Sequence, residues 1–243
     1  MMNVIKRGIY IFQKQGLFVV IKKGIVFFWA KIIGLVGRLL FQSNSKKYWD
    51  FRMKYNWNFV GGGEQTLYFA AGAMANVDLS KLRNINSVLD FGCATGDSAI
   101  LLKIFFPNAK IFLHDLSSIG VEKGINKYSR FLPVSKYKPG EKADLVYCSN
   151  VIEHVKNPID LVNELINCTL EYVLIQCPWE EIHPVNGKLI SPENQTDEHT
   201  WTINEDFYEK YIKDPRIRWT FTKGVVPMAW DGGVQGFYLG KLV

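Results

Sequence analysis

The sequence predicts an α/β fold with a mostly parallel sheet and helices on both faces. Three observations lead to this fold class. Apolar, β-branched runs alternate with helical segments from Ser87 to Cys177, which is the order of a parallel sheet with crossover helices. A glycine-containing turn follows the first of these runs, where such sheets commonly bind ligands. The chain has 243 residues, of which 48% are apolar and 21% charged, so it can fill a sizeable core and is not disordered.

The positive charge of the chain is concentrated at its N-terminal end. Residues 1–49 contain nine lysines and arginines and no acidic residue, whereas the whole chain has a formal charge of +6. Residues 50–243 therefore carry a slight negative charge. A strongly basic folded body is typical of nucleic-acid binders, so this distribution excludes that class and we expect no nucleic-acid partner.

Residues 1–42 are predicted to form a basic amphipathic segment at a membrane interface. Basic residues interrupt the apolar sequence in octads that begin at Lys6, Lys14 and Lys22, so neither a signal peptide nor a span of about 20 apolar residues is indicated. Because positions eight residues apart drift around a continuous helix, we expect short helical pieces that bend at the glycines. Apolar side chains would then enter lipid while lysines contact anionic headgroups. The alternative is a helical hairpin packed on the body or on a second subunit, which leaves a homodimer open.

A polar break and an aromatic connector separate this segment from the predicted sheet. Ser43–Lys47 is the break, and the predicted globular domain comprises residues 43–243. The connector is rich in tyrosine and tryptophan and ends in three glycines at 61–63. The apolar residues of Glu64–Asn76 then have helical spacing and predict a helix.

From Ser87 onward the sequence alternates between strands and helices. Short β-branched and apolar runs bounded by turn residues predict the strands, and apolar residues at helical spacing predict the helices between them. The strands are Ser87–Phe91, Lys110–His114, Ala143–Cys148 and Glu171–Cys177, and the helices are Asp97–Phe105, Ser118–Tyr128 and Pro158–Cys168.

The C-terminal part predicts a helix and a hairpin. Pro178 ends the last strand of the alternation, and a polar stretch continues to Thr200. Ile203–Ile212 has helical spacing. Arg218–Val226 and Gln235–Leu242 predict two strands joined by a glycine-containing turn, as expected of a hairpin at the edge of the sheet.

The turn after the first strand carries the clearest functional signal. Asp90 lies at the end of that strand, and Gly92 and Gly96 allow a tight turn and a close approach of a ligand to the backbone. Asp115 ends the next strand, where a carboxylate can accept hydrogen bonds from both hydroxyls of a ribose. The spacing differs from the dinucleotide motif G-x-G-x-x-G, and the lysine of a phosphate-binding loop is missing.

Together these features resemble the class I S-adenosylmethionine-dependent methyltransferases, in particular members that act on small molecules and in polysaccharide pathways. Leu89–Gly96 resembles their first motif, with Ala94 in the place of the middle glycine. His114–Ser117 resembles the acid of the second strand, and Asp144–Val155 resembles the fourth-strand segment with its Glu-His pair. The resemblance covers roughly residues 85–215. It implies a Rossmann-like, seven-stranded, mostly parallel sheet and S-adenosylmethionine as cofactor.

The resemblance also implies roles for individual residues. Asp90 would support the glycine loop, and Asn150 would face the amino group of the cofactor. Asp115 would bind the ribose, with Leu116 against the adenine. The connector Tyr48–Gln65 resembles a segment that folds over the cofactor in some sugar and polysaccharide methyltransferases. The residues that would line the methionine end of the cofactor are Gly92, Ala94 and Gly96.

One part of the expected pocket departs from the family pattern. The family usually has an acid that contacts adenine after the third strand, but Arg130–Pro139 contains no carboxylate. Ser135 or the backbone would serve in its place.

The histidines are the candidate catalytic residues. A hydroxyl acceptor needs a group that takes its proton near neutral pH, and histidine is suited to this. His154 lies beside Glu153 near the expected acceptor face, and His183 and His199 flank the polar stretch after the fourth predicted strand. The alternatives are a structural hydrogen bond for His154 and solvated loop positions for the other two, and His114 is expected to be structural. The tryptophans that could stack on a sugar or quinone ring, or pack in the core, are Trp179, Trp201 and Trp230.

The four cysteines have no metal-ligand spacing and lie in or beside apolar runs, so no metal site is predicted and a reducing, cytosolic compartment fits. We therefore predict an enzyme, cytoplasmic and peripheral on the membrane, that O-methylates a hydroxyl of a membrane-associated glycan or lipid-linked sugar. A quinone or other lipid is the alternative acceptor. The alternative from another class is a non-catalytic, membrane-docked interaction protein with a vestigial methyltransferase fold.

Overall fold

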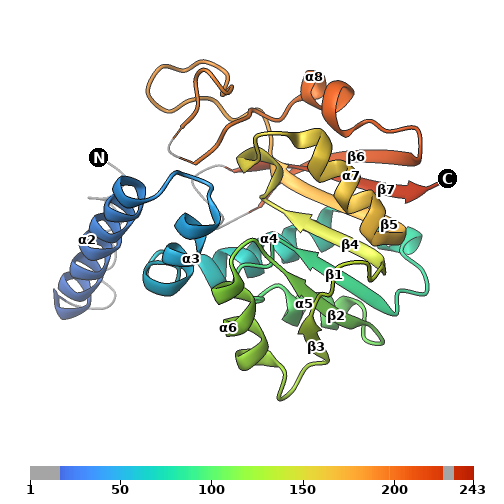
Figure 1. The fold of residues 1–243 in the computed structure, drawn as a ribbon, viewed down its shortest axis with the longest axis horizontal. Helices are drawn as coiled ribbons and strands as arrows, with labels where there is room; N and C mark the ends of the chain where they lie inside the picture. Colours follow the sequence, from blue (N-terminus) through green and yellow to red (C-terminus); the bar gives the residue numbers. More distant parts are fainter. Residues whose placement is uncertain (1–16, 197, 227–232) are drawn as a thin grey trace.

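A computed structural model describes residues 17–196, 198–226 and 233–243. The described residues form a seven-stranded sheet in the order β3-β2-β1-β4-β5-β7-β6 (Figure 1). Strand β7 runs antiparallel to both of its neighbours, and the other pairs are parallel. The strands are β1 (Ser87–Phe91), β2 (Lys110–His114), β3 (Val134–Lys136), β4 (Ala143–Ser149), β5 (Thr169–Pro178), β6 (Ile217–Val225) and β7 (Val234–Leu242).

Helices cover both faces of this sheet and enclose two apolar cores. One core lies under α4 (Gly62–Asn76), α5 (Ala99–Phe105) and α6 (Ser118–Tyr128). The other lies under α7 (Pro158–Cys168) and the short α8 (Glu205–Phe207). Because successive strand residues point to opposite faces, neighbours such as Val88 and Leu89 lie in different cores. The predicted fold class is therefore confirmed.

The strand β3 was not among the strands that the sequence predicts. It has three residues, and it pairs with Ile111–Leu113 of β2 at the edge of the sheet. The chain then passes from β3 to β4 through residues 137–142, which contain no helix. Tyr137 is buried in this crossover, and its hydroxyl donates to the carbonyl of Glu141 at 2.9 Å. A three-residue strand is too short to show a periodic pattern, so the sequence offered no signal for it.

The N-terminal described segment is one continuous helix, α2 (Leu17–Leu40), so the expectation of short pieces that bend at the glycines is wrong. Gly37 of α2 faces Phe51, and a Cβ atom at this glycine would lie 2.9 Å from the Phe51 ring. The glycine therefore permits a close helix–helix contact rather than a bend. Residues 1–16, which include Lys6 and Lys14, lie outside the described residues.

The aromatic connector contains a helix, α3 (Lys46–Tyr55), which was not among the helices that the sequence predicts. Ser45 is its N-cap, and the Ser45 hydroxyl accepts a hydrogen bond from the backbone N–H of Tyr48 at 3.2 Å. Figure 1 shows α3 between α2 and the sheet, with α2 at the margin of the molecule. The cap, followed by the Lys46–Asp50 pair one turn apart, is a helix signal that could have been read from the sequence.

The C-terminal elements agree with the sequence in type. The predicted helix over Ile203–Ile212 consists of α8 followed by a π-helical turn, Tyr208–Ile212. The predicted hairpin is β6 and β7, with β6 at the sheet edge. The expected glycine-containing turn and Trp230 fall in residues 227–232, outside the described residues.

Candidate active site

The glycine loop after β1 has a backbone that few other sequences could adopt. Gly92, Ala94 and Gly96 have φ angles of 79°, 50° and 70°, in the left-handed region that favours glycine. The N–H groups of Gly92 and Cys93 donate to the carbonyl of His114 at 2.8 and 2.9 Å. The loop is thereby fixed against the end of β2, with a strained alanine at its centre.

Asp115 links this loop to the start of α6. One of its carboxylate oxygens accepts the backbone N–H of Ala94 at 2.8 Å, and the other accepts the N–H of Ser117 at 2.7 Å. Burial raises the pKa of Asp115 to about 6, although these two hydrogen bonds lower it. Leu116 beside it is half-exposed. An acid and an exposed apolar side chain therefore lie together at the carboxyl end of β2.

Asp90 and Asp97, which flank the glycine loop in the sequence, hold it in place through hydrogen bonds. Asp90 is buried and accepts a hydrogen bond from the Ser98 hydroxyl, and its burial raises its pKa to about 7. Asp97 accepts hydrogen bonds at 2.6 Å from Lys127 and from the hydroxyl of Tyr128 on α6. The two acids thus hold the loop between β1 and α6.

Asn150 extends the site past the end of β4. It has a φ angle of 52°, and its backbone N–H donates to the carbonyl of Gln176 at 2.8 Å. Its side-chain nitrogen donates to the hydroxyl of Ser149 at 2.9 Å. The remaining atom, Oδ1, is buried and has no hydrogen-bond partner. An unpartnered buried acceptor at this edge of the sheet indicates a place where a ligand donates.

Helix α3 lies across the carboxyl ends of the strands and contacts two groups of polar residues. Asp50 accepts a hydrogen bond from the Ser117 hydroxyl at 2.7 Å, beside the glycine loop. Its neighbour Trp49 packs edge-on against the His154 ring, with 5.5 Å between ring centroids. Past the helix, the indole N–H of Trp57 donates to the Thr95 hydroxyl at 3.0 Å. The connector therefore contacts the glycine loop and Ser117, and its folding over a bound cofactor stays a prediction.

The second polar group contains Glu153, His154 and His199. Glu153 and His154 belong to the single 3-10 turn Ile152–His154 after β4, and His199 comes from the polar stretch after β5. The two imidazole rings are 4.8 Å apart, and Nε2 of His154 lies 3.8 Å from Oε1 of Glu153. The carboxylate of Glu153 is buried without any hydrogen-bond partner.

Each of these two histidines has its Nδ1 atom occupied. Nδ1 of His154 lies 3.0 Å from the backbone carbonyl of Glu198, and Nδ1 of His199 lies 2.5 Å from the carboxylate of Glu181. A carbonyl only accepts, and an ionised carboxylate does too, so both Nδ1 atoms carry the proton. In its neutral form, each ring therefore keeps a lone pair on Nε2.

Burial and neighbouring charges shift the pKa values of Glu153, His154 and His199 in different directions. Burial raises the pKa of Glu153 to about 7 and, together with His199, lowers the pKa of His154 to about 4. Burial would also lower the pKa of His199, but the hydrogen bond with Glu181 and the nearby carboxylates raise it. Glu198 pairs with Arg52 and accepts the Tyr48 hydroxyl at 2.8 Å, which ties the group to α3.

Comparison with known protein families shows which family has these residues. The family model described as a methyltransferase domain matches residues 63–211, which is more than half of the chain. The chain belongs to this methyltransferase family. The match spans the glycine loop, Asp115, Asn150 and the Glu153 group. The prediction of an S-adenosylmethionine-dependent methyltransferase is thereby confirmed.

Solved methyltransferase structures share the fold at low sequence identity. A plantazolicin methyltransferase with bound S-adenosylhomocysteine is 15% identical, with a TM-score of 0.57 over 90% of this chain and 100% of that one. Magnesium protoporphyrin IX methyltransferase from Synechocystis, also with S-adenosylhomocysteine, is 15% identical, with a TM-score of 0.52 over 76% and 85% of the two chains. Human N-acetylserotonin methyltransferase with S-adenosylmethionine is 14% identical, with a TM-score of 0.52 over 82% and 56%. No curated protein matches the chain.

The residues of the methyltransferase site fit S-adenosylmethionine as cofactor. The unpartnered Oδ1 of Asn150 suits an ammonium group, which has only donors to offer. Asp115 has lone pairs left beyond its two backbone bonds for the hydroxyls of a ribose. On β3, the Ser135 hydroxyl is buried and has no partner, so it is available in place of the acid that the family usually carries there.

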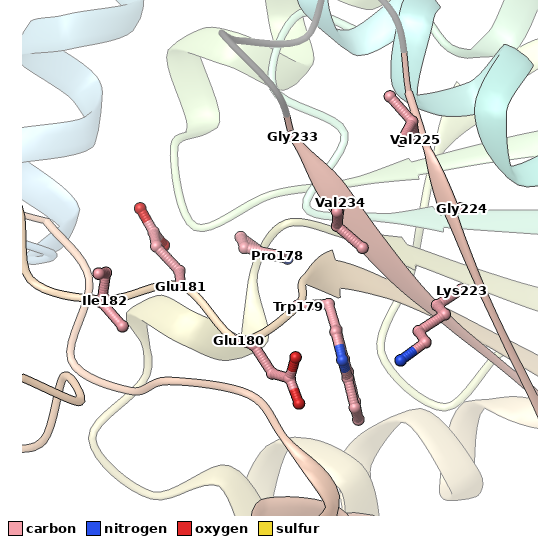
Figure 2. A pocket seen from close by; sticks show the side chains of 10 residues that line it. All are labelled: Pro178, Trp179, Glu180, Glu181, Ile182, Lys223, Gly224, Val225, Gly233 and Val234. Carbon is pink, nitrogen blue, oxygen red and sulfur yellow. The ribbon is translucent and has the colours of Figure 1, made fainter.

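His183 and Trp179, two further candidates from the sequence, each line a hollow at the surface. His183 shares a hollow of about 500 Å³ with Glu181, Glu198 and His199, and its Nδ1 accepts the N–H of Val185 at 3.2 Å. A second hollow of about 690 Å³ lies at the end of β5 (Figure 2). Figure 2 shows Trp179, Glu180, Glu181 and Lys223 around it. Glu181 lines both hollows, so they adjoin the histidine group.

Three aromatic positions prove to be packed inside the fold. Trp179 is buried and stacks near Phe221, with 4.6 Å between ring centroids. Trp201 donates its indole N–H to the carbonyl of Val155 at 2.8 Å. His114 lies between Phe91 and Tyr137, as expected of a structural histidine. Sequence reasoning missed Glu181, Glu198 and Arg52, because none of them has a spacing that relates it to the histidines.

Proposed function

We propose that this methyltransferase transfers a methyl group to a hydroxyl of a membrane-associated glycan or lipid-linked sugar. The observation that carries the proposal is the position of α3. Its residue Trp49 packs against His154, and the next residue, Asp50, accepts a hydrogen bond from Ser117 beside Asp115. A cofactor and an acceptor would therefore share one wall of the site.

The cofactor end would orient the reacting carbon. S-adenosylmethionine, when bound, supplies a methyl group that is already activated on a sulfonium. The chain's own contribution is position: Asp115 would hold the ribose, Asn150 the amino group, and the glycine loop the methionine end, with Leu116 against the adenine and Asp90 beneath the loop.

The acceptor end of the site, which contains His154, His183 and His199, would activate and position the acceptor hydroxyl. In their neutral forms His154 and His199 each have an Nε2 lone pair. Neutral His183 uses its Nδ1 lone pair to accept a backbone N–H and therefore presents an N–H at Nε2. We assign His154 and His199 to activation of the hydroxyl, and His183 to hydrogen bonding with the acceptor from the same hollow.

Helix α2 supports the location at a membrane surface. Among the side chains that the structure describes on it, from residue 25 onward, the exposed apolar ones fall within about 140° of the helix circumference, on the side away from α3. Nine basic residues and no acid within residues 1–49 favour an anionic lipid surface as the occupant of this stripe. No described helix is long and apolar enough to span a membrane. The stripe comprises Ile25, Phe28, Trp29, Leu35, Val36, Leu39 and Leu40.

Methyl transfer is tested with the full chain and S-adenosylmethionine labelled on its methyl group. The labelled cofactor is incubated with lipid-linked glycans, with quinones and with total membrane lipids, and label in each fraction is counted. Label in the glycan fraction, stable to mild acid as an ether is, supports the proposal. Label in the quinone fraction alone overturns the glycan acceptor, and cofactor binding without transfer to any fraction supports a non-catalytic protein.

Membrane association is tested by co-sedimentation with vesicles. We expect binding to vesicles that contain an anionic phospholipid, weaker binding at high salt, and loss of binding in the double variant Phe28→Ser/Trp29→Ser. Val185→Ser removes an even more exposed apolar side chain from a loop of the body and should bind like the wild type. Equal binding to vesicles of neutral lipid, or by the double variant, contradicts the proposal.

A further inference from the structure

Glu153 differs from the other buried acids near the site. Its side chain is 1% exposed, and neither carboxylate oxygen has a hydrogen-bond partner. Asp90 and Asp97, which are also buried, accept hydrogen bonds from hydroxyl or ammonium groups. A buried carboxylate without a partner is costly, so a protein that keeps one commonly supplies a proton or a cation to it.

The two histidines beside Glu153 are arranged as metal ligands usually are. Metal-bound histidines donate their second ring N–H to a carboxylate or a backbone carbonyl, which fixes the ring and leaves one nitrogen for the metal. His154 has the carbonyl of Glu198 at 3.0 Å from Nδ1, and His199 has the carboxylate of Glu181 at 2.5 Å. Both supporting contacts are thus present.

We propose that Glu153, His154 and His199 bind a divalent cation. One ligand atom from each of the three residues lies within 4.8 Å of the other two. Bonds of about 2.1 Å in a tetrahedral site place ligand atoms roughly 3.4 Å apart, so each pair of ligand atoms needs to approach by about 1.4 Å at most. Two imidazoles and one carboxylate favour Zn²⁺, Mn²⁺ or Fe²⁺ over Mg²⁺ and Ca²⁺, which prefer oxygen ligands only.

Three protein ligands leave a position for a further ligand, as in catalytic metal sites. His199 also lines the hollow of about 500 Å³, through which an acceptor oxygen can reach the ion. This use of the ion rests on the proposed function, with His154 and His199 activating the hydroxyl through the ion that their Nε2 atoms bind rather than by taking its proton. An acceptor hydroxyl bound to the ion has a lower pKa than a free hydroxyl, so it loses its proton to water at a lower pH. Its oxygen then forms the bond to the methyl carbon while the carbon–sulfur bond breaks and leaves its electron pair on sulfur.

The test measures metal binding and needs no activity. The full chain is stripped with a chelator and titrated calorimetrically with Zn²⁺ and Mn²⁺, and Co²⁺ is added separately to record its visible spectrum. We expect one ion per chain, and a Co²⁺ spectrum of a site with nitrogen ligands. Glu153→Gln and His199→Gln should each lower the affinity roughly 100-fold or more, and Glu181→Gln roughly tenfold.

His114→Gln is the matched control, because His114 packs between two aromatic rings and should not change metal affinity. Thermal unfolding of the metal-free variants shows whether each one folds. Glu153→Gln should be no less stable than the wild type, since it removes an unpartnered buried carboxylate. Equal metal affinity in Glu153→Gln and the wild type, or no binding by a folded wild type, overturns the site.

The outcomes also separate this inference from the proposed function. If the metal-free chain binds S-adenosylhomocysteine and methylates a glycan at the full rate, the catalytic use of the ion is wrong and the proposed function stands. If one ion binds through Glu153 but no acceptor is methylated, the metal site stands and the proposed function falls.

Discussion

The cofactor end and the acceptor end of this methyltransferase are built in different ways. At the cofactor end, the glycine loop after β1 is held by main-chain hydrogen bonds to the end of β2, and Asp90 and Asp115 have their partners within residues 94–117. At the acceptor end, the Glu153 group is assembled from α3, the turn after β4 and the stretch after β5, and it contains unpartnered buried atoms. The comparison teaches that contacts between neighbouring segments fix the first end, whereas the second depends on contacts between distant segments. Both ends keep an unpartnered buried acceptor, Oδ1 of Asn150 at the first and the Glu153 carboxylate at the second.

Substitution of Gly92 tests most strongly whether the cofactor end is rigid. A Cβ atom at Gly92, where φ is 79°, would lie 2.2 Å from Cγ2 of Val151. Backbone strain and overpacking together should make Gly92→Ala about 3 kcal/mol less stable, as measured by urea unfolding. Gly140 has a φ of 90° with no atom within 4 Å of such a Cβ, so Gly140→Ala should lose only about 1 kcal/mol. Equal losses of stability in the two variants would mean that the backbone of the glycine loop adjusts to the added Cβ atom, so that the cofactor end is not rigid.

The pH dependence of stability tests the burial of Asp90. Its pKa in the folded chain is about 7, above the ordinary value of 3.8, so the unfolded chain releases this proton at lower pH than the folded one. Between these two values, each rise in pH therefore costs the wild type stability that Asp90→Asn does not lose. From pH 5 to pH 8, the stability of Asp90→Asn relative to the wild type should increase by about 2–3 kcal/mol.

Urea unfolding of both proteins at several pH values, without cofactor, measures this difference. A constant difference across that range would show that Asp90 is ionised in the folded chain, and the cofactor end would then resemble the acceptor end in keeping a buried charge.

Asp115→Asn separates ligand binding from support of the fold. We expect the Kd for S-adenosylhomocysteine to rise roughly 30-fold, about 2 kcal/mol, because the ribose loses a charged acceptor. Asp144 is a matched control, since its carboxylate accepts the backbone N–H groups of Asn86 and Ser87 at 2.8 and 2.9 Å at the opposite end of the sheet. Asp144→Asn should lose stability but keep the affinity. Calorimetry that finds equal Kd values for both variants would remove Asp115 from the cofactor site.

The smallest expected effect concerns the tie between α3 and the acceptor end. Arg52 and Glu198 form a partly buried ion pair, with side chains 12% and 28% exposed, and Arg52→Met should cost about 1 kcal/mol of stability. Lys213 and Glu209 form an ion pair in which both side chains are 58% exposed, so Lys213→Met should change nothing measurable. Equal effects in urea unfolding would show that the Arg52 pair does not hold the acceptor end together.

Much of the fold could be predicted because its signals are local. The strands β1, β2 and β4 are short and mostly apolar, and the hairpin of β6 and β7 was placed within one or two residues. Strand β3 was missed because three residues carry no pattern, and α2 was wrongly divided because its glycines suggested bends. Gly37 shows the physical reason, since its missing side chain makes room for Phe51 of a helix that the sequence had not revealed.

The sequence by itself determined the alternation of strands and helices and the cofactor loop, because a glycine turn and an acid at the end of the next strand depend on neighbouring residues. Only the tertiary structure decided the acceptor end. Glu153, Glu181 and Glu198 become neighbours of the histidines through the path of the chain after β5, and α3 comes to lie over both ends through its contacts with Ser117 and His154. No spacing records such contacts, since they form between segments that meet only when the chain has folded.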